Sequence, residues 1–154
     1  MIPFQRFLDE QREPVWRFLV ASVGRDAADD CFQETFLAAM NAYPRLRAGS
    51  NLRAWVLTIA HRKALDHHRA RARNAIPVPD VPQVAVHDAP LRDDETWARV
   101  RDLPPKQRAA LLLRYAADLS HAEVAIALDC SEEAARRSAH EGLKKLRLEM
   151  SPTP

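Results

Sequence analysis

Three groups of polar side chains in this sequence have the types and the spacing to bind another macromolecule, and the first group is acidic. Its four members recur at helical intervals: Asp29, Asp30, Gln33 and Glu34. On a helix this spacing places them on one exposed face. Acidic faces are commonly just hydrated, and otherwise they dock a basic protein surface. Both interpretations stay open for this group.

The second group is a basic tract over residues 61–73. It holds five Lys or Arg side chains against one Asp, together with His61, His67 and His68. Cations in this density can follow a nucleic-acid backbone. The alternative is a hydrated helix end, since cations are favourable near helix C-termini. No carboxylate or thiol completes a ligand set with the histidines, so no metal site is predicted.

The third group lies where the sequence predicts a short helix, a three-residue break and a longer helix. Ser120 and Glu123 form a capping box, Ser131 is the expected N-cap of the second helix, and Asp129 should adopt the left-handed conformation between them. This order is typical of a helix-turn-helix. The exposed face of the second helix carries Glu132, Glu133, Arg136, Arg137, His140 and Lys144. Its cations could contact DNA, and the alternative is a helical hairpin with a hydrated face.

Helices must position all three groups. Apolar spacing predicts a first helix over residues 4–23, which Pro14 should kink or restart. A second helix is expected from an N-cap at Asp26 to about residue 40. Its inner stripe consists of Phe32, Phe36 and Met40.

A third helix is expected over residues 52–73. Its inner stripe consists of Leu52, Trp55, Val56, Ile59 and Ala60. Residues 74–93 contain four prolines without helical periodicity, which indicates an extended linker. Helices near 94–101 and from 105 onward should precede the helix-turn-helix. The predicted buried face of that motif consists of Val124, Ala127, Leu128, Cys130, Ala134 or Ala135, Ala139, Leu143 and Leu146.

Composition sets the fold class. A chain of 154 residues with three Gly and eleven Pro disfavours a hairpin-rich sheet and a Gly-rich phosphate loop. We therefore expect an all-α protein with two small helical domains, 1–73 and 94–150, joined by the Pro-rich linker 74–93. The net charge of +2 hides a pattern: residues 1–60 are balanced, 61–73 carry +4, 74–103 carry −3 and 104–154 carry +1.

The sequence also indicates a compartment. Cys31 and Cys130 are predicted to be buried free thiols in a reducing environment. No apolar run reaches the roughly 18 residues of a membrane span, and the N-terminus does not resemble a signal peptide. We therefore expect a cytoplasmic protein without membrane insertion. No catalytic constellation and no cofactor site are predicted.

The three groups follow the order of a known family: the chain resembles the extracytoplasmic-function (ECF) sigma factors, the smallest type in the sigma-70 family. Residues 26–37, DAADDCFQETFL, are similar to the family's region 2 segment D-A-x-D-x-x-Q-E-T-F-L, with one residue more before Gln33. LRAWVLTIA at 52–60, followed by ALDH at 64–67 and Arg69, resembles the promoter-melting helix. LPPKQR at 103–108, LSHAEVA at 119–125 and the last helix resemble region 4.

The resemblance implies an alternative sigma factor, not an enzyme, that binds core RNA polymerase and promoter DNA. Asp30, Gln33 and Glu34 would dock the clamp helices of the largest polymerase subunit. The −10 DNA element would meet Asn51, Trp55, Thr58, His61, Arg62, Lys63, His67 and Arg69. The −35 element would meet Arg108, Ser131, Glu132, Glu133, Arg136, Arg137, His140 and Lys144. Region 4 would also touch the flap of the second-largest subunit, and an anti-sigma factor is a candidate partner.

Three positions depart from the family pattern. Arg62 stands where asparagine is frequent, and Ser138 and Glu141 stand where the last helix commonly has arginine. The weakened arginine pattern of the last helix supports one alternative, a sigma-like mimic that binds an anti-sigma factor without engaging promoters. A second alternative is an ordinary helix-turn-helix repressor, which would leave the acidic group unexplained. The acidic group and the basic tract favour the sigma factor over both.

Overall fold

The computed structural model describes residues 1–74 and 99–150, and the regular structure within these ranges is helical throughout. The elements are α1 (Phe4–Val23), α2 (Arg25–Ala42), the 3₁₀ helix η1 (Tyr43–Arg45), α3 (Leu52–Arg73), α5 (Pro105–Tyr115), α6 (His121–Leu128) and α7 (Glu132–Met150). The all-α prediction is confirmed. Residues 99–101 are helical, in agreement with the end of the helix predicted near 94–101. The earlier part of that prediction and the predicted linker from residue 75 onward lie outside the described residues. None of the described helices is both long and apolar enough to cross a lipid bilayer.

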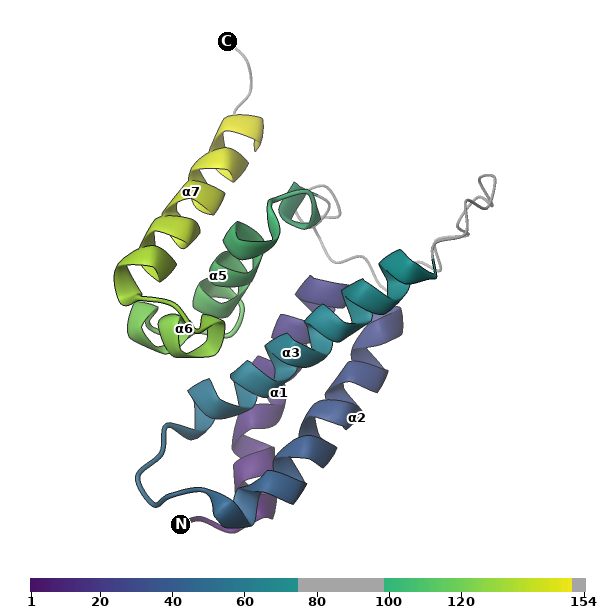
Figure 1. The fold of residues 1–154 in the computed structure, drawn as a ribbon, viewed down its shortest axis with the longest axis vertical. Helices are drawn as coiled ribbons and strands as arrows, with labels where there is room; N and C mark the ends of the chain where they lie inside the picture. The colour runs from purple at the N-terminus through teal and green to yellow at the C-terminus, as the bar shows by residue number, and fades with distance from the viewer. Residues whose placement is uncertain (75–98, 151–154) are drawn as a thin grey trace.

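Helices α1, α2 and α3 pack into a bundle (Figure 1). Aromatic rings join all three: the Phe7 ring centroid lies 5.2 Å from that of Tyr43, 5.7 Å from Trp55 and 6.3 Å from Phe36. The Tyr43 hydroxyl donates to the carbonyl of Ile2, which ties the start of the chain to the end of α2. Each favourable ring pair contributes about 0.5–1.5 kcal/mol beyond its buried area. This cluster therefore fixes α3 against the other two helices.

Two details of the bundle differ from the sequence predictions. Helix α1 continues through Pro14, and a restart there is not observed, because the apolar side chains on both sides of this proline are buried in one core. Helix α2 begins one residue before the predicted N-cap Asp26. Gly24, at φ 84°, takes the N-cap position and donates its backbone N–H to the carbonyl of Val20. One glycine thus ends α1 and begins α2, and Asp26 lies in the first turn of α2.

Helices α5, α6 and α7 form a second unit that contains the predicted helix-turn-helix. The Ser120 hydroxyl accepts from the backbone N–H of Glu123 at 3.1 Å, and the Glu123 carboxylate accepts from that of Ser120 at 2.9 Å. Asp129 ends α6 in the left-handed region, at φ 54° and ψ 53°. The Ser131 hydroxyl then accepts from the backbone N–H of Ala134 at 3.0 Å, which caps α7. All of these local predictions are confirmed.

Two predicted core residues are not buried. Cys31 lies in the core, but Cys130 is exposed in the turn between α6 and α7, where the chain crosses the surface. Met40 keeps 48% of its side chain exposed, because it lies on the outer face of α2. The predicted apolar face of the helix-turn-helix is otherwise buried or half-buried.

The two units pack against each other. Helix α3 contacts α6, and α1 contacts α5, so the second unit lies along one side of the bundle (Figure 1). At the start of α3 the Asn51 amide donates to the Glu123 carboxylate at 2.8 Å. This hydrogen bond joins residues that lie 72 positions apart in the chain.

Candidate functional site

The predicted acidic face lies on the outer side of α2. Asp29, Asp30, Gln33 and Glu34 are all exposed. In the part of the chain that the structure describes, no ion pair engages Asp30 or Glu34. The pKa of the Cys31 thiol beneath them is raised, first by burial and then by the charges of Glu34 and Asp30. The face therefore presents exposed negative charge.

Two apolar side chains share this face. Leu37 is 56% exposed and follows Glu34 by three positions, and Met40 follows Gln33 by seven. We call Asp30, Gln33, Glu34, Leu37 and Met40 the α2 face. Exposed apolar groups beside charges are typical of protein-binding surfaces. Sequence reasoning missed this apolar edge because it placed Met40 on the inner stripe by residue type.

The start of α3 is held by Asn51. Its side-chain oxygen accepts from the backbone N–H of Ala54 at 3.1 Å, so it caps the helix. The amide nitrogen of the same side chain donates to Glu123 of α6. Burial raises the pKa of Glu123, but hydrogen bonds from Ser120 and Asn51 outweigh that effect and lower it. In this arrangement both ends of the Asn51 amide are occupied.

Two further residues predicted to meet DNA are engaged within the fold. Trp55 is half-buried, and its ring packs against Phe7 and Tyr43 at 5.7 and 6.3 Å. Thr58 donates its hydroxyl to the carbonyl of Ala54 at 2.7 Å. Each therefore contributes to the structure of the bundle, and neither side chain is fully open to solvent.

His61 faces the second unit. It lines a pocket of about 440 Å³ together with residues of α5 and of the helix-turn-helix, among them Ala109, Cys130 and Arg137. Burial first, and then the charge of Arg62, lower the pKa of His61 from 6.5 to about 4. His61 is therefore neutral at physiological pH and adds no positive charge to α3.

The cations of α3 divide between two sides of the helix. Arg62 and Arg69 are exposed and lie seven residues apart, so they share the open face. Lys63 is half-buried and lies near Cys31 of α2, whose pKa its charge lowers. His67 is also half-buried, with its ring 5.8 Å from that of His68. The structure therefore does not gather the predicted −10 residues on a single open face.

The outer face of α7 keeps all six predicted residues exposed: Glu132, Glu133, Arg136, Arg137, His140 and Lys144. Its arginines are paired within the helix, Arg136 with Glu132 at 3.1 Å and Arg137 with Glu133 at 3.7 Å. Exposed pairs of this kind contribute about 0.3–0.5 kcal/mol, so a phosphate can displace the glutamates at small cost.

Two other predicted residues do not lie on that face. Arg108 belongs to α5, where it is half-buried and donates to the carbonyl of Arg101 at 2.9 Å. Ser131 uses its hydroxyl to cap α7. Glu141, one of the departures from the family pattern, accepts from the Gln107 amide at 3.3 Å, which directs it toward α5.

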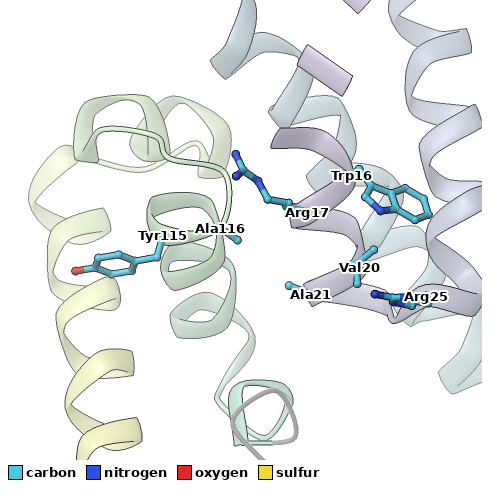
Figure 2. A pocket seen from close by; sticks show the side chains of 7 residues that line it. All are labelled: Trp16, Arg17, Val20, Ala21, Arg25, Tyr115 and Ala116. Atoms are coloured by element: carbon cyan, nitrogen blue, oxygen red, sulfur yellow. The ribbon is translucent and has the colours of Figure 1, made fainter. Parts of the chain in front are cut away.

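Figure 2 shows a second pocket, of about 360 Å³, between α1 and the end of α5. Its lining is Trp16, Arg17, Val20, Ala21, Arg25, Tyr115 and Ala116. Arg17 extends from α1 toward the chain that follows α5, whereas the Tyr115 ring points away from α1 (Figure 2). This pocket marks a second place where the two units meet, and no pattern in the sequence predicts it.

Comparison with known proteins shows the family of this chain. Residues 8–74 match the model of sigma-70 region 2, and residues 94–146 match that of sigma-70 region 4. The ECF RNA polymerase sigma factor SigC of Mycobacterium tuberculosis is 35% identical over 132 residues, which cover 82% of this chain and 71% of that protein. This chain belongs to the ECF sigma factors of the sigma-70 family. The recognition from sequence is therefore confirmed.

A second relative and a solved structure are similar over nearly the whole of this chain. SigD of Mycobacterium tuberculosis is 34% identical over 158 residues, which cover 93% of this chain and 74% of that protein. The fold is similar to that of the sigma factor RpoE of Bartonella quintana, solved in complex with the anti-sigma factor NepR, with a TM-score of 0.80 and 21% identity. That likeness covers 97% of this chain and 98% of RpoE. The fold likeness therefore spans both units.

Proposed function

We propose that this sigma factor binds core RNA polymerase through the α2 face and directs the enzyme to promoters. The supporting observation is that Asp30, Gln33 and Glu34 are exposed and lie beside the apolar Leu37 and Met40, with no ion pair to Asp30 or Glu34 within residues 1–74 and 99–150. A surface with this chemistry fits the clamp helices of the largest subunit, because a basic partner would neutralise the carboxylates and cover the apolar edge.

Promoter contacts are assigned to two other surfaces. The exposed Arg62 and Arg69 of α3 would hold the backbone of the −10 element, with Asn51, Trp55, Thr58, His61, Lys63 and His67 around them. The outer face of α7 would enter the major groove at the −35 element, as the second helix of a helix-turn-helix does. The proposed domain limits are 1–73 and 94–150, with the segment between them as linker.

The proposed role is binding, without catalysis or a cofactor. Its partners are the polymerase clamp helices, the flap of the second-largest subunit and promoter DNA, and these place the protein in the cytoplasm. Because RpoE of Bartonella quintana was solved with an anti-sigma factor, an anti-sigma factor is proposed as a further partner. A sigma-like mimic would not start transcription with core polymerase, so a transcription assay distinguishes it from the proposed sigma factor.

Run-off transcription with core polymerase and a promoter library tests the proposal. We expect the sigma factor to direct transcription from a subset of the library, and the sequences recovered should share two elements. If the chain binds core polymerase but starts no transcript from any promoter, the assignment as a promoter-specificity subunit is wrong.

Paired substitutions test the α2 face. Gln33→Ala with Glu34→Ala should weaken binding to core polymerase while leaving thermal unfolding unchanged, because both side chains are exposed. The matched control is Gln5→Ala with Asp9→Ala, an amide and a carboxylate exposed on α1. If the two double variants bind core polymerase with equal affinity, the assignment of the α2 face as the docking surface is wrong.

A further inference from the structure

The pocket between α1 and the end of α5 (Figure 2) belongs to none of the surfaces assigned to polymerase or to promoter DNA. Its volume of about 360 Å³ lies in the range of small-molecule sites, about 300–1,000 Å³, and such sites occur preferentially where two structural units meet. Apart from two arginines, its lining consists of apolar and aromatic residues. The pocket is therefore large enough and apolar enough to hold the ring system of a small organic molecule.

The apolar part of the lining is held in place by the packing behind it. Ala21 is 5% exposed, and Val20 and Ala116 are half-buried. The Trp16 indole packs edge-on against the Phe32 ring, with the two centroids 5.7 Å apart and the planes at 82°. A planar apolar ligand would thus meet side chains that are already ordered, which lowers the cost of binding.

Two guanidinium groups border this apolar lining. Figure 2 shows Arg17 and Arg25 with Val20 between them. Both arginines are exposed, and within residues 1–74 and 99–150 neither side chain forms an ion pair or a hydrogen bond. This holds although Glu13 lies four positions before Arg17 and Asp26 directly follows Arg25. The pocket therefore offers two cations whose donors are available to a ligand.

A third cation lies beside the pocket. The guanidinium of Arg101 lies against Gly24, with a terminal nitrogen 3.6 Å from the position that a Cβ on this glycine would occupy. Because Gly24 directly precedes Arg25, Arg101 adds positive charge at that side of the pocket. Like charges at short range repel each other, and a bound anion would offset this repulsion. Arginine also binds carboxylates and other oxyanions through paired N–H donors.

We propose that this pocket binds a small aromatic anion, such as an arylcarboxylate or an arylsulfonate. The ring system lies against Trp16 and Val20, and the anionic group accepts hydrogen bonds from Arg17 and Arg25. Because Ala116 at the end of α5 completes the lining, the ligand contacts both units. The site is separate from the α2 face and from the outer faces of α3 and α7, so the inference goes beyond the proposed function and does not rest on it.

Two fluorescent probes with the same ring system test the assignment. Anilinonaphthalene sulfonate is an aromatic anion, and N-phenylnaphthylamine has the same rings without the sulfonate group. Both become strongly fluorescent in apolar surroundings, so titration of the full chain measures the affinity for each probe. We expect both probes to bind at one site per chain, and absence of binding by the sulfonate overturns the proposal.

Arginine substitutions separate the anionic part of the site from its apolar part. Arg17→Gln with Arg25→Gln should weaken binding of the sulfonate by about tenfold or more, because charge-assisted hydrogen bonds are lost, and should leave the affinity for the neutral probe unchanged. The matched control is Arg45→Gln with Arg47→Gln, two exposed arginines beyond the end of α2. If the sulfonate binds the Arg17 and Arg25 double variant as tightly as the wild type, or if both probes lose affinity equally, these arginines do not hold an anion and the proposal is wrong.

Filling the pocket tests where the probes bind. Ala116→Leu adds volume to the lining without changing the charge, so it should weaken binding of both probes. Ala122→Leu, at an exposed position of α6, is the matched control and should bind both probes as the wild type does. Circular dichroism checks that each variant is folded. Unchanged affinities in folded Ala116→Leu would place the probes elsewhere and contradict the assignment.

Competition tests the chemical class of the ligand. Naphthoate should displace the sulfonate probe and raise the midpoint of thermal unfolding of the wild type, since it binds the folded chain, but it should not stabilise the Arg17 and Arg25 double variant. If a short peptide of alternating aspartate and leucine displaces the probe and naphthoate does not, the pocket accepts an acidic segment of a partner protein, and the proposal is wrong. The proposed function is read separately, by run-off transcription without added ligand.

Discussion

His61 makes the folded chain sensitive to acid. It lines the pocket between α3 and the α5–α7 unit, where burial first, and then the charge of Arg62, lower its pKa from 6.5 to about 4. The unfolded chain, whose His61 titrates near 6.5, therefore binds a proton between these two pH values that the folded chain does not bind. The stability contributed by neutral His61 is complete above pH 6.5 and is lost as the pH falls toward 4.

The size of the effect follows from the two pKa values. Between pH 7 and pH 5 the linkage relation gives a loss of about 2 kcal/mol in the free energy of unfolding from His61 alone. His68 acts in the same direction, because burial and the charge of Arg108 lower its pKa as well. Other charged side chains around the pocket are Lys106, Asp129 and Arg137.

Urea unfolding followed by tryptophan fluorescence measures this loss. Wild-type protein and the His61→Gln variant, which cannot titrate at this position, are compared at pH 7 and pH 5. The wild type should lose about 2 kcal/mol more than the variant. His140→Gln, at an exposed position of α7, is the matched control and should keep the wild-type dependence. If His61→Gln also shows the wild-type dependence of stability on pH, the reasoning about the buried neutral imidazole is wrong.

Three further predictions concern single residues. In the native protein Cys130 should react with a thiol reagent, whereas Cys31, buried and with a raised pKa, should react only on unfolding; mass spectrometry after brief labelling decides, and equal labelling contradicts the assigned burial. Ser120→Ala should lower the free energy of unfolding by about 1 kcal/mol, because the capping box is lost; an unchanged value in urea unfolding would show that the cap contributes nothing. Asp129→Gly should raise the free energy of unfolding by up to about 1 kcal/mol, and Asp129→Val should lower it, because the φ of 54° at this position suits glycine and strains a β-branched residue. The reverse order of the two variants in thermal unfolding would contradict the left-handed conformation.

The helix-turn-helix could be predicted almost completely, because its signals are local. The capping box, the left-handed turn residue and the cap of α7 each depend on side chains within three positions of the backbone group that they satisfy. The acidic face of α2 followed in the same way from helical spacing. The exposure of single side chains is harder to predict from sequence. Cys130 and Met40 are apolar and are predicted to be buried, but both are exposed, because residue type does not reveal which face of a helix a neighbour covers.

The sequence by itself therefore determined the family, the helices, their caps and the separate surfaces of opposite charge. These depend on residue type and on spacing of a few positions. Only the tertiary structure decided that α3 packs along the α5–α7 unit, that His61 is neutral in the resulting pocket, and that Asn51 binds Glu123. The Asn51–Glu123 hydrogen bond alone joins residues 72 positions apart, and no periodicity in the chain specifies such contacts. They arise because two folded units present complementary apolar and polar groups to each other, which is a property of their surfaces after folding.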